Sequence, residues 1–438
     1  MGGDPFLLLQ QVSFLKPGFR KNMNNLGILF FFLIFINPLL AQSTSTPPPI
    51  ISLPGFGTHT VNLENSKSLT LSLPGDLDLF VAAQGMKCPR FMTFSPDHRL
   101  FVAGLYNRGD TQLGRVYLLE DFDPQTGAFG KVITYMDHLH NPNSVAFYSD
   151  LTGQTWIYIA QTDRLSRFHY EPGSEKPTGA EEILATFPAY GLGYKYGGWH
   201  LTRTLCFGGN GKLYVSVGSS CNACEEKKEE TRACVLEMDP DGKNQKVFAS
   251  GLRNAVGLKW VNGQLFATNM GADHLGDDNP DDTFYAVEKS RNYGWPYAYV
   301  SKGTNQPDPK FGAEKAETAL KWMPLCYSSF PAHSSPLGLE YFGSDFEIPE
   351  LRNYFLVGLH GSSKQRLGRG YRIVRLRKGL PPEDFITGFR KDGKVLGRPC
   401  DILRVGPDAF FFTDDLDGIL YYVRNKRTPV KLKNGLNQ

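Results

Sequence analysis

The chain has 438 residues, of which 41% are hydrophobic and 21% charged, a balance typical of a globular protein. Its net charge of +3 gives no reason to expect binding to nucleic acid or to an anionic membrane surface. Aromatic residues make up 13% of the chain, 46 residues are glycine, and no long stretch has sustained helical periodicity, so short strands and turns are expected.

The first 42 residues have the pattern of a signal peptide. Basic residues precede the apolar run 26–40, which is broken by Pro38 and followed by the small residue Ala41. The run is shorter than the ~20 apolar residues that a membrane span needs, although an uncleaved anchor is the alternative. We expect cleavage near Ala41, no stable membrane span afterwards, and a periplasmic or secreted mature protein.

The segment 43–60 is rich in proline, serine and threonine near its start and is expected to be a linker to one domain at 61–430. In that domain an apolar strand, a polar turn and two further strands recur in the same order six times. The copies are 89–119, 143–170, 198–238, 254–287, 336–376 and 400–423.

This recurrence, at spacings of roughly fifty residues or more, predicts an all-β fold, a six-bladed β-propeller. Strand 78–82 is expected to complete the last blade and close the ring, and the polar stretch 300–323 is expected to be a long rim loop. A β-sandwich is the alternative fold, but it does not explain the constant order of strand and turn.

The third copy holds a histidine, a hairpin and a Cys-x-x-Cys loop. His200 precedes the hairpin, whose second strand alternates, with Leu213, Val215 and Val217 on one face and Tyr214 on the other. His200 is therefore expected at one rim of a sheet, where propellers carry their binding sites.

The chain has seven cysteines, some of which should pair in an oxidising compartment. Cys221 and Cys224 could close a small disulfide loop. Glu225 stands where c-type haem attachment requires histidine, so haem is excluded. Zinc bound with the help of Cys206 and Cys234 is an open alternative.

Six sequence pieces in constant order carry a family resemblance: VGSSCNACEE (217–226), VFASGLRNAVGL (247–258), NYGWPYAY (292–299), LHGSS (359–363), GRPCDI (397–402) and TDDLDGILYYV (413–423). The chain resembles the PQQ-dependent soluble sugar dehydrogenases, the glucose/sorbosone dehydrogenase family, and looks most like the L-sorbosone dehydrogenase branch. The resemblance spans 71–424. It implies a six-bladed propeller that oxidises a sugar at C1 by hydride transfer to PQQ, with an aldose or osone as substrate. A separate electron acceptor, a cytochrome or a quinone, is then needed.

The resemblance assigns site residues position by position. His200 matches the general base, and Arg253 and Asn254 match the arginine–asparagine pair beside PQQ. Arg398 matches the first arginine of an R-x-R element. The cofactor lysine of the family has no clean match, and Lys364 or, as its rival, Arg366 stands in about the right place. Asn143 and His360 are further candidates for the cofactor site, with a structural role as the alternative for His360.

Two positions depart from the family pattern. Cys400 replaces the second arginine of an R-x-R element that begins at Arg398, which weakens the expected carboxylate clamp. Ser363 and Lys364 replace the tryptophan and asparagine that usually follow HGS.

The acidic run 271–282 suits Ca²⁺, because hard oxygen ligands are dense in this loop. By the resemblance, the backbone carbonyls of Gly271 and Ala272 hold the calcium that bridges to PQQ, and Asp281 or Asp282 would hold a second, structural calcium. A solvated acidic loop is the alternative.

Two other functions remain open at this point. A calcium-dependent propeller lactonase would explain the acidic loop but not the arginine–asparagine pair. A non-catalytic propeller that binds a glycan or a protein partner would explain the altered cofactor positions. Dependence on PQQ, on a metal alone or on neither distinguishes the three.

Overall fold

The computed structural model describes residues 49–64, 67–189, 200–226 and 231–427. The signal peptide predicted at 1–42 lies outside these residues. None of the described helices is long and apolar enough to cross a membrane. The hairpin of β1 (Phe56–Asn62) and β2 (Ser68–Pro74) begins inside the segment predicted as a linker.

Blades 1 to 3 follow one another along the chain. Blade 1 consists of β4 (Pro89–Phe94), β5 (Leu100–Gly104), β6 (Gly114–Asp123) and β7 (Ala128–Leu139). Blade 2 consists of β8 (Ser144–Ser149), β9 (Thr155–Ala160), β10 (Arg164–His169) and β11 (Thr178–Thr186). Blade 3 consists of β12 (Leu205–Phe207), β13 (Leu213–Val217), β14 (Cys234–Met238) and β15 (Lys246–Ser250).

Blades 4 to 6 complete the ring. Blade 4 consists of β16 (Ala255–Val261), β17 (Gln264–Asn269), β18 (Asp282–Val287) and β21 (Ser328–Phe330). Blade 5 consists of β22 (Pro336–Phe342), β23 (Tyr354–Leu359), β24 (Arg372–Leu376) and β25 (Glu383–Ile386). Blade 6 consists of β28 (Pro399–Val405), β29 (Ala409–Asp414), β30 (Ile419–Asn425) and β3 (Leu77–Ala83).

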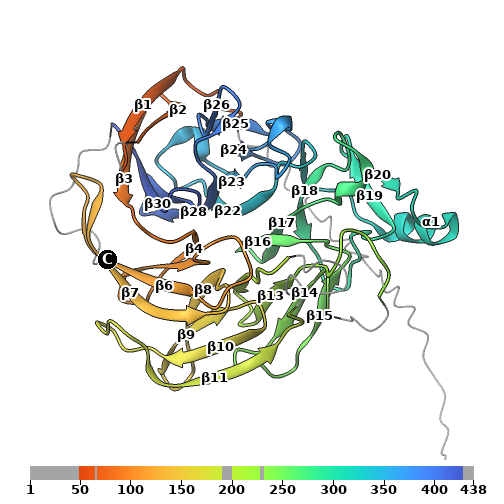
Figure 1. Cartoon of the computed structure of the whole chain (residues 1–438), viewed down its shortest axis with the longest axis horizontal. Coiled ribbons are helices and arrows are strands. Elements are labelled where there is room, and N and C mark those ends of the chain that lie inside the picture. Colours follow the sequence, from red (N-terminus) through yellow and green to blue (C-terminus); the bar gives the residue numbers. More distant parts are fainter. Residues whose placement is uncertain (1–48, 65–66, 190–199, 227–230, 428–438) are drawn as a thin grey trace, which may run out of the picture. The chain divides into compact units, whose positions relative to one another are not determined.

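Among the described residues, these strands form six four-stranded antiparallel sheets arranged around a common centre (Figure 1). The first strand of each blade contacts the first strand of the next, and β28 contacts β4. The all-β, six-bladed propeller predicted from the sequence repeat is therefore confirmed.

The ring is closed by strands from opposite ends of the domain. β3 pairs antiparallel with β30, with Leu79 opposite Val423 and Phe80 opposite Tyr422. The prediction that strand 78–82 completes the last blade is confirmed. This pairing gives blade 6 its fourth, outermost strand, as in the other five blades.

The core consists of layers between neighbouring blades. In β13 every residue is buried. Leu213, Val215 and Val217 pack toward blade 2, whereas Tyr214 packs toward blade 4. The alternation read from the sequence is thus correct, and both faces are apolar because each blade is covered on both sides.

The segment predicted as a rim loop at 300–323 is instead largely regular structure. β19 (Ala298–Ser301) and β20 (Thr304–Pro307) form a hairpin, followed by α1 (Ala313–Trp322). The prediction was wrong because only Ala316 of the helix is buried, so α1 lacks the apolar stripe that identifies a helix in a sequence. The remaining short elements are η2 (Asp273–Leu275), η3 (Pro349–Leu351), η4 (Gln365–Leu367), β26 (Arg390–Lys391) and β27 (Lys394–Val395).

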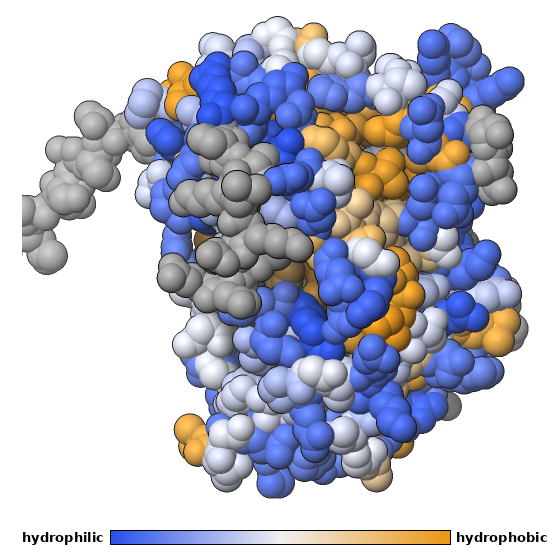
Figure 2. Space-filling model, turned by 90° about the vertical axis from the view of Figure 1, so that its left-hand side faces the viewer, coloured by the Kyte–Doolittle hydropathy of each residue, from blue (hydrophilic) through white to orange (hydrophobic). Residues whose placement is uncertain are grey.

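The outer side of the ring exposes apolar surface where blade 6 meets blade 1. Figure 2 shows an apolar hollow on this side of the molecule. A cavity of about 290 Å³ lies between these two blades and is lined in part by Phe94, Phe122, Phe129 and Phe411. The residues predicted for catalysis and cofactor binding do not line it.

Closure of the ring makes a testable contribution to stability. Leu77 of β3 is buried in the layer between blades 5 and 6. Leu77→Ala should lower the free energy of unfolding by about 2–5 kcal/mol, because it leaves a cavity in that layer. Ile183→Ala, at a half-exposed position of β11, should change it by less than about 0.5 kcal/mol. Urea denaturation measures the free energy of unfolding of both variants. Equal losses in the two variants would contradict a contribution of β3 to stability through ring closure.

Candidate functional site

Polar side chains gather at one end of the propeller axis, where the first strands of the blades begin. Arg90 lies in β4, and Asn143 and Thr204 directly precede β8 and β12. Arg90 Nε donates to Asn143 Oδ1 at 2.9 Å, and Asn143 Nδ2 donates to Thr204 Oγ1 at 2.8 Å. All three residues are buried, so hydrogen bonds between blades replace the water that these groups lose.

The contacts continue through Asp415, which follows β29. Arg90 Nη1 lies 2.9 Å from Asp415 Oδ2, and His360 Nε2 lies 2.8 Å from Asp415 Oδ1. His360 Nδ1 lies 3.4 Å from Arg398 Nη1. We name this set the axial network: Thr204, Asn143, Arg90, Asp415, His360 and Arg398. Three residues predicted separately for the cofactor site, Asn143, His360 and Arg398, are thus brought together.

Asp415 is the anion on which the axial network depends. Burial would raise its pKa, but His360, Arg90 and Arg108 outweigh burial and hold the pKa well below its usual range. Burial lowers the pKa of His360, against the opposing effect of Asp415. The contacts of His360 suit a neutral ring with the proton on Nε2, facing the carboxylate.

Blades 1 and 6 each begin with a cysteine, a proline and an arginine, and the cysteine and the arginine stand in opposite order in the two blades. Cys88-Pro89-Arg90 enters β4 and Arg398-Pro399-Cys400 enters β28, and in both strands the pairing shifts register after the proline. Cys400 is fully buried, and burial raises its thiol pKa well above the usual range. It packs with Phe91 and Leu337 rather than binding a carboxylate. The second arginine at the axis is Arg90, from the neighbouring blade.

His200 lies five residues before β12, with its ring hydrogen-bonded to the loop after β13. Its Nδ1 lies 2.9 Å from the backbone oxygen of Ser219, so Nδ1 carries the proton and Nε2 is the basic nitrogen. Burial, with the charge of Arg253, lowers the pKa of His200 well below its usual value. The residue has a φ of 61°, and Arg203 Nη1 donates to its backbone oxygen at 2.7 Å. The ring is thus neutral, and the residue has an uncommon backbone conformation.

Gly218 permits the close approach of His200 to Asn254. A Cβ at Gly218 would lie 2.5 Å from His200 Cβ and 2.7 Å from Asn254 Oδ1. Asn254 is itself buried, and its Nδ2 lies 3.4 Å from Met270 Sδ, beside the apolar cluster that contains Cys400. Only glycine fits between the predicted base and the predicted cofactor asparagine.

Arg253 is a buried cation with two neighbouring partners. Its Nη2 lies 3.1 Å from Asp273 Oδ2, and its Nε and Nη2 each donate to an oxygen of Asn222 at 3.0 Å. Burial lowers the pKa of Arg253, against the opposing charges of Asp273 and Asp282. His200, Arg253 and Asn254 therefore lie together, and their roles, assigned by the resemblance, stay predictions.

Three of the four predicted metal positions, Gly271, Ala272 and Asp281, line one cavity of about 30 Å³, room for a single ion or water. Within the described ranges, no backbone hydrogen bond outside the helices and strands ends on the carbonyl oxygen of Gly271 or Ala272, and Ala272 is the N-cap of η2. Asp282 accepts hydrogen bonds from the backbone of Gly271 and Ser335, at 2.8 and 2.7 Å, and burial raises its pKa to about 6.

Asp281 is engaged differently, because its Oδ2 accepts a hydrogen bond from Gly303 N at 2.9 Å. The carboxylates of Asp281 and Asp282 thus bind different segments, and a structural calcium at one or the other stays a prediction. Nowhere in the described part of the chain are three His, Cys, Asp or Glu side chains grouped to hold a metal.

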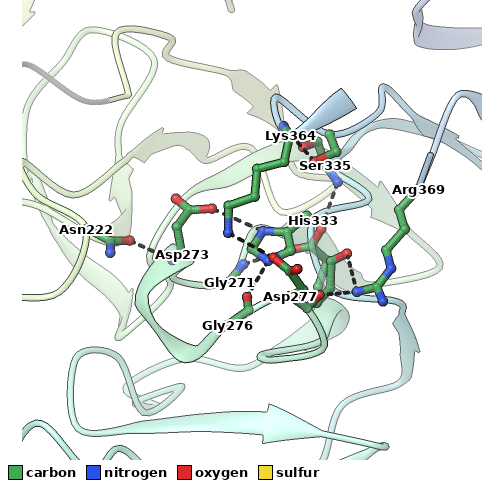
Figure 3. A network of polar contacts seen from close by, with 12 residues as sticks. Asn222, Gly271, Asp273, Gly276, Asp277, His333, Ser335, Lys364 and Arg369 are labelled. Atoms are coloured by element: carbon green, nitrogen blue, oxygen red, sulfur yellow. Dashed lines mark hydrogen bonds and ion pairs between the residues drawn. The ribbon is translucent and has the colours of Figure 1, made fainter. Parts of the chain in front are cut away.

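The acidic loop is largely neutralised by basic side chains from blade 5 (Figure 3). Arg366 Nη2 lies 2.7 Å and Lys364 Nζ lies 3.7 Å from the carboxylate of Asp277, and Arg369 pairs with Asp278. Lys364 and Arg366, both predicted to bind the cofactor, are thus directed to this loop. In the described part of the chain, neither forms a hydrogen bond or ion pair with the axial network.

Cys221 and Cys224 form a disulfide, as the sequence suggested. Cys206 and Cys234 pack in different interblade layers, so the structure does not support the zinc alternative.

Sequence reasoning missed Arg90, Asp415 and Asn222. Aligning the repeats would have placed Arg90 at the same strand position as Cys400. Asp415 and Asn222 lie within motifs that were recognised, TDDLDG and SSCNAC, but their partners are distant in sequence.

Comparison with known proteins identifies the family. The model of the TrAA12-like family matches residues 73–384, so the chain belongs to the TrAA12-like family. An uncharacterized protein of Borreliella burgdorferi is 31% identical over 224 residues, a match that spans 49% of this chain and 57% of that protein.

Solved structures share the fold at low identity. The PQQ domain of pyranose dehydrogenase from Coprinopsis cinerea, in its holo form, has a TM-score of 0.67 and 16% identity over 81% of this chain and 97% of that one. A calcium structure of the Trichoderma reesei family AA12 enzyme has a TM-score of 0.65 and 18% identity over 81% and 96%. The PQQ-bound aldose sugar dehydrogenase of Streptomyces coelicolor has a TM-score of 0.53 and 17% identity over 80% and 99%.

Asp414, which accepts a hydrogen bond from Arg398 N, predicts a distinctive pH dependence. Burial raises its pKa from 3.8 to about 7. The folded protein therefore keeps this proton longer than the unfolded chain, and the wild type loses stability as pH rises from about 4 to about 7. Asp414→Asn removes that loss, so its thermal midpoint should rise relative to wild type between pH 5 and 8.

Asp415→Asn is the matched control, because the pKa of Asp415 is lowered and its charge is paired. That variant should be less stable than wild type at neutral pH. Parallel pH profiles for Asp414→Asn and wild type would contradict the assignment.

The fit at Gly218 gives a second prediction. Gly218→Ala should displace His200 or Asn254 and lower stability by about 1–3 kcal/mol, the usual cost of overpacking. Gly55→Ala is the control, since a Cβ there meets no atom within 4 Å. Denaturation of both variants measures the difference in the free energy of unfolding. An unchanged free energy of unfolding for Gly218→Ala would show that His200 and Asn254 do not approach Gly218 this closely.

Proposed function

We propose that this member of the TrAA12-like family is an exported, PQQ- and Ca²⁺-dependent dehydrogenase that oxidises an aldose or a related sugar aldehyde at C1. The observation that carries the proposal is His200: a half-buried, neutral imidazole with its proton fixed on Nδ1, beside the buried cation Arg253. The solved PQQ domain and the PQQ-bound dehydrogenase that share the fold support it.

Arg398 suits an anionic cofactor. Its Nη1 donates to the Gly361 oxygen at 3.0 Å, and its guanidinium lies 5.1 Å from the Tyr371 ring centre. Among the described residues it forms no ion pair with a carboxylate. A tricarboxylate such as PQQ would supply the missing anionic partner.

The surroundings of Arg398 are also basic. A cavity of about 690 Å³ is lined by Arg398 with Arg108, Lys67 and Lys394, and Asp417 is the acidic residue in its wall. An excess of cations favours a ligand with several negative charges. Arg398 and Arg108 would hold carboxylates of PQQ.

The backbone oxygens of Gly271 and Ala272 would be ligands of the calcium, because both residues line a cavity of ionic size and Ca²⁺ is bound by oxygen ligands. Asn254 and Arg253 would lie beside the cofactor.

PQQ, when bound, supplies a quinone that accepts two electrons from the sugar as a hydride. His200 would accept the proton of the sugar hydroxyl at Nε2, while the Ser219 oxygen stabilises the imidazolium through Nδ1–H. Arg253 would stabilise negative charge that develops beside it. The electrons then pass to a separate acceptor, a cytochrome or a quinone.

Export is supported by the signal-peptide pattern at 1–42 and by the Cys221–Cys224 disulfide, since disulfides persist in oxidising compartments. The sorbosone branch remains a prediction from the sequence.

The test is a titration of the metal-stripped protein with PQQ, with and without Ca²⁺, followed by a panel of aldoses. Binding that requires Ca²⁺, followed by bleaching of the quinone absorbance on addition of sugar, is expected. His200→Ala should lower kcat by about 10²–10⁴-fold. His138→Ala, at an exposed position, should not change it. Absence of PQQ binding at micromolar concentrations would contradict the proposal and favour a lactonase or a binding protein.

The pH profile gives an independent check. Because the pKa of His200 is lowered well below 6.5, its protonation should begin to reduce kcat/KM only below that pH. A loss of activity centred above pH 6.5 would show that His200 is not the base.

A further inference from the structure

The Cys-x-x-Cys loop after β13 contacts both proposed catalytic side chains. On one side, the Ser219 backbone oxygen binds His200 Nδ1, and Ser219 Oγ donates to the Cys221 oxygen at 2.6 Å. On the other side, Asn222 lies inside the four-residue ring closed by Cys221 and Cys224 and faces Arg253.

Both oxygens of Asn222 are used to hold the site. Its backbone oxygen accepts from Arg253 Nε at 3.0 Å and from Trp295 Nε1 at 3.1 Å. Its Oδ1 accepts from Arg253 Nη2 at 3.0 Å and from Asp273 N at 2.8 Å. Asn222 thus binds the Arg253 guanidinium at two nitrogens. It also binds the backbone of Asp273, the residue whose carboxylate pairs with Arg253 (Figure 3).

The disulfide loop is braced from outside as well. Arg232 Nη1 donates to Ser220 Oγ at 2.6 Å, and Arg232 Nη2 donates to the Cys224 oxygen at 2.8 Å. The Arg232 guanidinium lies 5.0 Å from the ring centre of Trp295, the residue that also binds Asn222. These contacts fix the loop against blade 4.

A disulfide that only stabilised the whole fold would be expected to close a long segment. The entropy lost by the unfolded chain grows with the length of the closed loop, and a separation of three residues is near the minimum. The effect of this disulfide is therefore local, on the backbone that presents the Asn222 oxygens.

We propose that Asn222 is a positioning residue: the Cys221–Cys224 disulfide holds its two oxygens on the guanidinium of Arg253, and so sets where that cation lies in the site. The consequence for PQQ rests on the function proposed above. The positioning itself is a property of the protein alone.

The first experiment needs no cofactor. Crystal structures of Asn222→Ala and of Cys221→Ser/Cys224→Ser should show the Arg253 guanidinium displaced from Asp273 or spread over several conformers. Mutation is preferable to chemical reduction, because thiols and phosphines also react with quinones. A guanidinium that keeps its contact with Asp273 in both variants would overturn the inference, whether or not PQQ binds.

The second experiment is a double-mutant cycle on the PQQ dissociation constant. Asn222→Ala should weaken binding about tenfold, the effect of losing a hydrogen bond to a charged group. In an Arg253→Ala background the same change should have less than a twofold effect, because Asn222 acts through Arg253. Equal effects in both backgrounds would overturn the inference.

Two variants control for a general structural effect. Asn222→Asp keeps an oxygen acceptor for Arg253 and for Asp273 N, so it should retain more affinity than Asn222→Ala. Asn210→Ala, in the hairpin turn of the same blade, removes a hydrogen bond to the Tyr214 hydroxyl and should leave affinity unchanged. If the wild type does not bind PQQ, the proposed function fails, whereas the crystallographic result still decides the positioning role.

Discussion

The pairing of β3 with β30 is the constraint on which the rest of the structure depends. It joins the two ends of the propeller domain and forces blade 6 against blade 1. Only then can Arg90 reach Asp415, 325 residues further along the chain. The axial network is therefore a product of ring closure, and its Arg90–Asp415 ion pair joins blade 1 to blade 6.

Desolvation explains most of the chemistry at this end of the axis. The first strands begin in a buried region, so each polar side chain there must bind another or remain unsatisfied. Where an anion is available, as at Asp415, the cations are paired. Where the neighbour is a cation, as for His200 beside Arg253, the ring is held neutral. Arg398 forms no ion pair with a carboxylate of the described residues, which is why we propose an anionic cofactor there.

The sequence predicts local and repeated features well. Six copies of the strand–turn pattern give the blade number, and period-two alternation gives the faces of β13, because both depend on neighbouring residues. His200, Arg253 and Asn254 were found by resemblance, and they do meet. The disulfide needed only two cysteines at suitable spacing.

Features that depend on distant partners could not be predicted. The ion pairs of the acidic loop have no local signal, because Lys364, Arg366 and Arg369 lie some ninety residues away from it and come close only in the folded ring. Arg90 and Asp415 have no local signal for the same reason. α1 was missed because it packs on the β19–β20 hairpin and buries little apolar surface. The cysteine at position 400 could be understood only from the structure, which places Arg90 at the matching strand position of the next blade.

The most direct test of the central claim is a crystal structure of the protein with PQQ and Ca²⁺. The account predicts PQQ at the axial end of the propeller, with a carboxylate on Arg398, calcium at the Gly271 and Ala272 oxygens, and the cofactor beside His200 and Arg253. Density for PQQ elsewhere on the ring, such as the hollow between blades 1 and 6, or none at saturating concentration, would contradict it.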